Sequence, residues 1–329
     1  MGNLPKGITR KQKILHAIAT GDTSDLPEGI TRKEKILHAI ASGDTSNIPE
    51  GITREEQILQ YIAENGGGDG GESAEVLKKL IERTVTNYAI PDGITKIGNA
   101  AFYRCANLEN VTIPNSVIEI GDSAFEYTNI SSIDIPPNVK KIGRYCFAHN
   151  INANVLKSIT FHEGLETICS GAFRYHGCEN ITLPSSVKTI EDAAFEDGKL
   201  LKTFTIPEDI GITIIPGFML ANCPLLENVT IPEGIIEIGN GAFQGDWDEG
   251  NKITSVVLPS TLELLLNNAF SYCTNLETVT FKGTPTQRIE SAFQNSPSLK
   301  TINVPWAEGE VENAPWGARN ATINYNYVE

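Results

Sequence analysis

The sequence has few of the features that mark membrane, nucleic-acid-binding or disulfide-rich proteins. No apolar run approaches the ~18 residues that a membrane-spanning helix needs. No block of lysine and arginine stands out among 41 acidic and 26 basic residues, and the net charge of −15 argues against wrapping a phosphate backbone. Six cysteines in 329 residues are too few for a dense disulfide framework. We therefore expect no nucleic-acid partner and no membrane span.

The first residues also lack targeting features. No apolar segment of the kind that a secretory signal contains follows Met1, so we expect no signal peptide in this chain as given. Gly2 is not followed by serine or threonine at position 6, which argues against myristoylation.

Three similar units open the chain at a period of 22 residues, and each contains the phrase P-x-G-I-T-R. In each unit a threonine precedes Gln or Glu by three residues, as Thr9 precedes Gln12, and this spacing is typical of a helix start. Apolar residues such as Ile14 and Ile18 follow at helical spacing. Residues 1–64 are therefore expected to form three short helices that dock to a larger assembly or self-associate. The alternative is a self-packed bundle or a string of linker helices.

Glycine-rich composition separates these units from the rest of the chain. Residues 65–73 read as a flexible linker. Residues 74–83 predict one more short helix, which would cover the open end of a repeat array over residues 74–304. Residues 305–329, with two tryptophans and an alternating N-A-T-I-N-Y-N-Y segment, predict a C-terminal cap with a final strand.

One phrase recurs from Tyr88 onward: L-x-x-V-T-I-P-x-x-V-x-x-I-G-x-x-A-F-x-x-C. Val111 and Ile113 alternate with polar residues, which predicts a strand with one buried face, and Pro114 ends that strand. The large anchor residue of the phrase returns every 22 to 27 residues, as Phe102, Phe125, Phe147, Phe173, Phe195, Leu220, Phe243, Phe270 and Phe293. Such a period predicts a stacked solenoid. We expect an α/β repeat fold with one short parallel strand per coil, ten strands in all, after the helical region.

The phrase resembles the BspA-type leucine-rich repeats of bacterial surface proteins over about residues 85–305. Departures are local: Cys146 replaces the alanine, Cys169 replaces the glycine, and residues 215–220 differ most. Members of that family are adhesion and recognition proteins, so the resemblance implies binding of a protein or a cell-surface glycan rather than catalysis.

Both ends of the chain show a second resemblance. The N-terminal units and the segment from Val304 onward resemble the ends of leucine-rich proteins encoded with tail and baseplate genes in prophages of Gram-positive bacteria. This resemblance implies a virion-associated or bacterial-surface location.

Short hydroxyl and amide side chains recur on the exposed side of the predicted strands. They can bond a polyhydroxylated ligand such as a glycan, or they are β-favouring residues that bond to one another. The candidate ligand-binding residues on this face are Asn110, Thr112, Ser132, Asp134, Ser158, Thr160, Asn180, Thr182, Thr203, Thr205, Asn228, Thr230, Thr278 and Thr280.

Insertions lengthen the third, fourth and seventh coils just after the anchor, at residues 149–155, 175–178 (with His176) and 246–250, so we expect them to form a rim. In the seventh coil the insertion carries Trp247 between acidic residues, which makes it a candidate contact aromatic. Asp246 and Asp248 faintly resemble a calcium loop, but Val257 stands where a bidentate glutamate is required.

Candidate reactive residues have simpler explanations. Cys105, Cys223 and Cys273 each lie three residues after an anchor, as expected for a column of small half-buried thiols. His149, His176 and Cys178 fall near one another in neighbouring coils, but no C-x-x-C pair supports a zinc site. We therefore assign no metal, no cofactor and no catalytic residue.

Three functions follow, in decreasing order of support. The first is a non-enzymatic recognition or adhesion scaffold. The second is a structural spacer or assembly protein with no ligand of its own. The third is a glycan hydrolase, which needs paired carboxylates, whereas the predicted strand face offers only Asp134.

Overall fold

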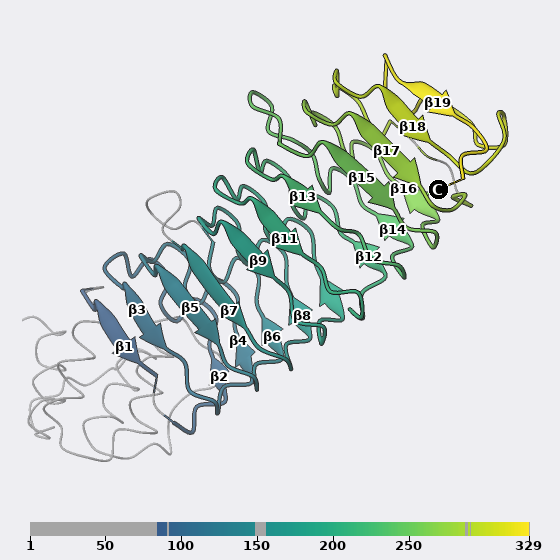
Figure 1. The fold of residues 1–329 in the computed structure, drawn as a ribbon. Helices are drawn as coiled ribbons and strands as arrows, with labels where there is room; N and C mark the ends of the chain where they lie inside the picture. The colour runs from purple at the N-terminus through teal and green to yellow at the C-terminus, as the bar shows by residue number, and fades with distance from the viewer. Residues whose placement is uncertain (1–83, 91, 149–155, 287–288, 290, 329) are drawn as a thin grey trace, which may run out of the picture.

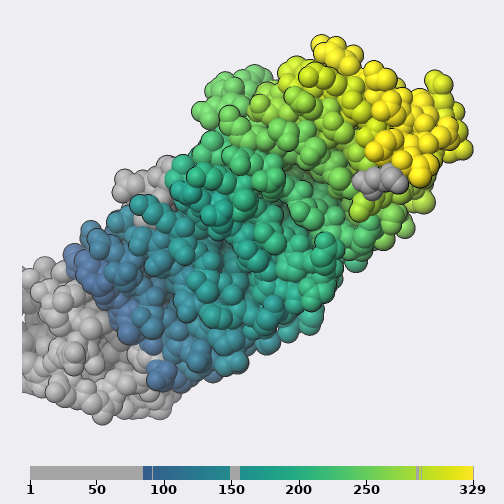
Figure 2. Space-filling view, in the orientation of Figure 1, coloured from purple at the N-terminus to yellow at the C-terminus, as the bar shows by residue number. Residues whose placement is uncertain are grey.

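Figure 1 shows a computed structural model of the chain, which describes residues 84–90, 92–148, 156–286, 289 and 291–328. Over these residues the chain winds into an elongated stack of coils. Each regular coil crosses a first row of parallel strands, a second row of parallel strands, and a third side made of tight turns. The space-filling view in Figure 2 shows the stack from the same direction, with successive coils in close contact.

The first row contains the strands that the alternating pattern predicts, together with a final strand near the C-terminus. The eleven strands are β1 (Asn87–Ala89), β3 (Asn110–Thr112), β5 (Ser132–Ile135), β7 (Ser158–Phe161), β9 (Asn180–Thr182), β11 (Thr203–Thr205), β13 (Asn228–Val229), β15 (Ser255–Leu258), β17 (Thr278–Phe281), β18 (Thr301–Asn303) and β19 (Thr322–Asn324). Within a strand, Ile133 and Ile135 are buried and Ser132 and Asp134 are exposed, as period-two alternation requires.

The second row contains strands that the sequence analysis did not anticipate. They are β2 (Lys96–Ile97), β4 (Glu119–Ile120), β6 (Lys141–Ile142), β8 (Thr167–Ile168), β10 (Thr189–Ile190), β12 (Ile214–Ile215), β14 (Glu237–Ile238) and β16 (Leu264–Leu265). In each strand the second residue is buried and faces the core. The glycine that follows allows neighbouring coils to stack closely. A Cβ on Gly121 would lie 2.4 Å from the side-chain oxygen of Asn99 and 2.7 Å from the backbone nitrogen of Asn99. The glycine is thus needed for contact between coils rather than for an unusual backbone angle.

The third side carries the anchor residues in tight turns that are bonded from coil to coil. The backbone amide of Phe102 donates a hydrogen bond to the carbonyl of Ala124 at 2.7 Å. The backbone amide of Phe125 donates to the carbonyl of Cys146 at 2.8 Å. Residues two positions before and after an anchor often take left-handed angles, as Ser123 does with φ of 54°. Such angles disfavour ordinary side chains, so the coil-to-coil bonds must hold them in place.

Stacked phenylalanine rings fill the interior behind this side. Phe102, Phe125, Phe147, Phe173 and Phe195 follow one another with ring centroids 5.0 to 5.4 Å apart and interplanar angles of 4 to 8°. Every anchor side chain of the described coils is almost completely buried. Offset stacking at this distance is favourable for aromatic pairs, so the anchor column contributes more than its buried area alone.

The predicted α/β class is wrong. The described residues contain strands, turns and bends but no α-helix, and each regular coil has two strands instead of one. The physical reason lies in the return segment between the second strand and the next first-row strand. Its tight turns place residues such as Ser123 at left-handed angles, and several of its backbone amides donate to carbonyls of the next coil rather than to carbonyls four residues earlier, as an α-helix requires. The preceding α-helical region (residues 1–64), the linker (residues 65–73) and the capping helix (residues 74–83) lie outside the described residues, and no helix supports that part of the predicted fold.

The C-terminal end closes over the last coils. Strand β19 pairs in parallel with β18 and supplies the expected final strand. Trp306 and Trp316 are 3% and 1% exposed, and both rings contact Phe281 at centroid distances of 5.2 and 5.9 Å. The amide of Phe293 donates to the carbonyl of Trp316, which continues the bonding of the third side.

Candidate recognition surfaces

The predicted columns lie side by side on the outer side of the first row. Ladder pairing puts Asn110 beside Asn87, Ser132 beside Ser158, and Thr203 between Asn180 and Asn228. The second column is aligned in the same way, with Asp134 beside Thr160 and Thr182 beside Thr205. The candidate residues are exposed except Thr203, Thr278 and Thr280, which are partly buried. The structure therefore groups the predicted residues on one surface.

Some of these side chains bond to one another along the stack. The Asn110 amide donates to the Asn87 side-chain oxygen at 2.7 Å, and the Thr203 hydroxyl donates to that of Asn180 at 2.6 Å. Asp134 is joined to the ring of His162 at 2.7 Å. At these positions the side chains stabilise the stack, which is the explanation that requires no ligand.

The face is hollowed at one of the three places where the first row passes from one sheet to the next. Strands β13 and β15 belong to separate sheets, and a groove of about 280 Å³ lies between them. Asn228 and Thr230 line the groove with Ser255 and the 41% exposed side chain of Val257. Two of the predicted residues thus lie in a concave site with both polar and apolar walls.

The groove also contains charged residues that the sequence analysis missed. Its charged lining residues are Glu208, Glu227, Glu233 and Lys282. Partial burial acts to raise the pKa of Glu233, but hydrogen bonds from the hydroxyl and amide of Ser260 outweigh burial and lower this pKa. Glu233 is therefore held as a carboxylate that accepts hydrogen bonds, which suits ligand binding better than general-acid catalysis.

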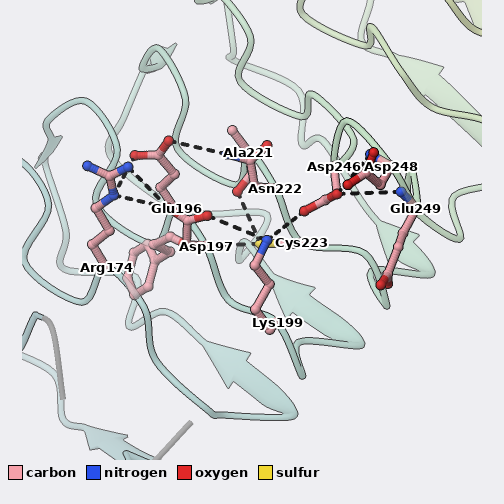
Figure 3. A network of polar contacts seen from close by, with 11 residues as sticks. Arg174, Glu196, Asp197, Lys199, Ala221, Asn222, Cys223, Asp246, Asp248 and Glu249 are labelled. Carbon is pink, nitrogen blue, oxygen red and sulfur yellow. Dashed lines mark hydrogen bonds and ion pairs between the residues drawn. The ribbon is translucent and has the colours of Figure 1, made fainter. Parts of the chain in front are cut away.

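A second polar site lies on the third side, shown in Figure 3. Arg174 forms ion pairs with Glu196 at 2.8 Å and with Asp197 at 3.1 Å. Lys199 lies between Asp197 and Asp246, at 3.6 and 2.6 Å from their carboxylates. The network links the fourth, fifth and seventh coils, although 47 residues separate Lys199 from Asp246.

Burial and ion pairing act in opposite directions on the pKa values of this network. Desolvation raises the pKa of Glu196, and the attraction of Arg174 offsets only part of that effect. For Lys199, burial acts to lower the pKa, but its bonds to Asp246 and Asp197 outweigh burial and raise the pKa. Lys199 therefore remains a cation that holds the insertion at residues 246–250 against the fifth coil.

Comparison with known proteins identifies the family. The profile of the BspA type leucine rich repeat region matches six copies, over residues 81–155, 151–248 and 247–314. The chain belongs to the BspA-type leucine-rich repeat family. Among proteins with curated functions, none matches this chain.

Solved structures share the fold. A leucine-rich repeat protein from Bacteroides ovatus superposes with a TM-score of 0.50 at 20% identity, covering 74% of this chain and 75% of that chain. A leucine rich cell surface protein from Faecalibacterium prausnitzii gives a TM-score of 0.40 at 24% identity. The match covers 64% of this chain and 63% of the Faecalibacterium prausnitzii chain. At these identities the likeness concerns the fold alone.

The cysteines of this BspA-type chain occupy the interior. All six are free and buried. Burial raises the pKa of Cys178, Cys223 and Cys273 to about 12, which keeps these thiols protonated. Cys223 and Cys273 contact the anchor carbonyls of the preceding coils, those of Phe195 and Phe243. The column of thiols three residues after an anchor is therefore confirmed, but these thiols are fully buried rather than half-buried.

The metal candidates do not form an accessible site in the described residues. His176 is fully buried, and its Nδ1 accepts a hydrogen bond from the amide of Cys178 at 3.2 Å. His149 lies outside the described residues. Within those residues no group of three or more His, Cys, Asp or Glu side chains is arranged to hold a metal ion. The described part of the chain also contains no helix that could span a membrane.

Proposed function

We propose that this protein is a non-enzymatic recognition and adhesion scaffold that binds a protein or glycan partner through the outer side of the first strand row. The groove between β13 and β15 carries this proposal. It joins the predicted residues Asn228 and Thr230 to an exposed apolar residue, Val257, and to charged residues around them. Concave sites that combine apolar and convergent polar groups are typical of binding sites.

The location of the scaffold is part of the same proposal. Membership of the BspA-type family supports a role at a bacterial surface. The resemblance of both chain ends to prophage tail-associated proteins supports a virion instead. Tail genes beside the gene for this chain would favour the virion, and their absence would favour the bacterial surface.

The competing function is a structural spacer with no ligand. The bonds between Asn110 and Asn87 and between Thr203 and Asn180 favour it, because they show that column residues can serve the stack itself. Such side-chain hydrogen bonds involve only some residues on the outer side of the first row. Within the described structure, none joins the side chains of the groove residues Asn228, Thr230 and Ser255 to one another.

Binding to arrays of glycans, cell-wall fragments and surface proteins tests the proposal. We expect the full chain to bind at least one class, and expect Asn228→Ala with Thr230→Ala to weaken that binding about tenfold. Ser158→Ala with Thr160→Ala is the matched control, because these exposed residues hold the same columns outside the groove. If the folded protein binds no ligand of the arrays, the spacer function is favoured. An equal loss of binding affinity in both variants would exclude the groove as the binding site.

A further inference from the structure

The insertion at residues 246–250 presents the most exposed aromatic side chain of the described structure. Trp247 is 76% exposed, whereas Trp306 and Trp316 are 3% and 1% exposed. The segment precedes β15 and projects from the edge of the stack (Figures 1 and 2). Placing an indole in water forgoes the burial that large aromatic residues normally gain, and exposed tryptophan is enriched at protein interfaces.

The insertion is held in one conformation by bonds at its base. Asp246 and Gly250 exchange two backbone hydrogen bonds of 2.9 and 2.8 Å. The Asp246 carboxylate accepts the amides of Asp248 and Glu249 at 3.0 and 3.4 Å and the Lys199 ammonium at 2.6 Å. The loop is therefore ordered before a partner arrives, which lowers the entropic cost of binding.

A neighbouring coil supports the indole. Trp247 and Tyr272 lie with ring centroids 5.5 Å apart and an interplanar angle of 29°. Tyr272 itself takes a left-handed angle, with φ of 56°, in the turn of the eighth coil. One side of the indole thus packs on a fixed ring and most of the remainder faces solvent.

The charge around the indole is negative and unbalanced. Asp248 and Glu249 are exposed, and neither forms an ion pair with any residue in the described ranges. Lys199, the cation near the loop, is engaged by Asp246 and Asp197. A cation placed over an indole face is attracted to it, and two flanking carboxylates strengthen that attraction.

We propose that the 246–250 loop is a docking point for a protein partner that presents arginine or lysine side chains, with a cation over Trp247 and between Asp248 and Glu249. The charge favours this partner class: a neutral sugar can stack on tryptophan and donate hydroxyl hydrogen bonds to the carboxylates, but it gains no charge attraction, and an anionic glycan is repelled. The docking point rests on the proposed recognition function but uses a surface separate from the groove.

The experiment uses the full chain and a hexa-arginine peptide. Because Trp306 and Trp316 are buried, peptide-dependent changes in tryptophan fluorescence report on Trp247. Calorimetric titration then compares variants. We expect Trp247→Ala to raise Kd about tenfold, and Asp248→Asn with Glu249→Gln to raise it about fivefold and to flatten the salt dependence between about 50 and about 500 mM NaCl.

A matched control carries the same change of charge far from the loop. Asp92→Asn with Glu109→Gln alters two exposed acids in the first coils and should leave Kd within about twofold. Equal affinity for wild type and Trp247→Ala would overturn the docking point, as would a neutral hexamer of N-acetylglucosamine that shifts the fluorescence where hexa-arginine does not. If the protein binds hexa-arginine but no ligand of the array, only the groove proposal is contradicted. If it binds a ligand of the array but not hexa-arginine, only the docking point is contradicted.

Discussion

The coils before the sixth and the coils after it form two separate stacks in the second strand row and in the column of anchor rings. The second row forms one sheet from β2 to β10 and a separate sheet from β12 to β16. The stack of anchor rings likewise runs from Phe102 to Phe195, is interrupted by Leu220, and resumes from Phe243 to Phe293. Both interruptions fall in the same coil, where Pro216 also occupies the position of the usual glycine.

The outer side of the second row differs between the two regions as well. Before the interruption, Glu119 pairs with Lys96 and Lys141 at 3.1 and 3.9 Å, so opposite charges alternate along the stack. After it, the outward residue is apolar on β12 and β16, at Ile214 and Leu264, and charged on β14, at Glu237. The outward position of the second row thus changes from paired charges on β2, β4 and β6 to mostly apolar residues.

The interrupted coil nevertheless stays attached through its other two sides. Strand β11 pairs with both β9 and β13, and the amide of Phe195 donates to the carbonyl of Met219. The difference teaches that one row and one anchor ring can be lost locally when the remaining rows keep their hydrogen bonds. Each coil is stabilised by its neighbours through several parallel sets of contacts.

The anchor column offers the largest expected effect. Phe173→Ala removes a buried ring that stacks on two neighbours, and we expect the free energy of unfolding to fall by ~3–5 kcal/mol. Leu220→Ala, at the interruption, removes no ring contact, and its loss should lie near the lower end of the ~2–5 kcal/mol range. Denaturant unfolding measures both, and equal losses would show that ring stacking adds nothing to the first region.

Acid should destabilise the region before the interruption through His176. Burial lowers the pKa of His176 from 6.5 to about 4, so the folded protein resists a proton that the unfolded chain accepts. The contribution of the neutral His176 ring to the free energy of unfolding is fully present above pH 6.5 and is lost as pH falls towards 4. The shift corresponds to about 3 kcal/mol.

Unfolding measured at a series of pH values checks this expectation. His176→Asn should remove much of the dependence in that window, because the amide oxygen can still accept from Cys178 but does not titrate. The exposed His162 supplies the control, since His162→Asn should leave the effect of His176 in place. A pH profile unchanged by His176→Asn would contradict the assignment.

The ion pairs of the second row should have the smallest effect. Glu119→Gln breaks two contacts with partly exposed lysines, and exposed pairs contribute ~0.2–1 kcal/mol each at most. We expect a loss near ~0.5 kcal/mol that shrinks as salt rises. Ile214→Gln in the other region should show no salt dependence, and similar salt curves for both variants would remove the contrast between the regions.

Much of the first row was predictable because its signal is strong. Alternation at Val111 and Ile113 with a repeat near 23 residues places the polar residues in columns, and the ladder pairing confirms that alignment. The second row was missed because a strand of two residues, such as Lys141–Ile142, is too short for any periodicity to be visible.

Long-range sites were the least predictable. Lys199 and Asp246 lie 47 residues apart, and neither belongs to a motif, so only stacking brings them together. The groove carboxylates Glu208 and Glu233 lie in turns beyond the strands, outside the columns on which the hydrolase hypothesis was judged. His176 was assigned to a rim, yet the structure buries it in the column that holds Cys223.

The sequence by itself determined the repeat, its anchors and the side on which short polar residues face outward, because period and alternation are local properties that every coil repeats. Only the tertiary structure decided that the coils contain no helix in the described part, where the sheet opens into a groove, and which distant charges hold Trp247 in place. Those features depend on departures from the repeat in neighbouring coils, and their consequences emerge only when the coils are stacked.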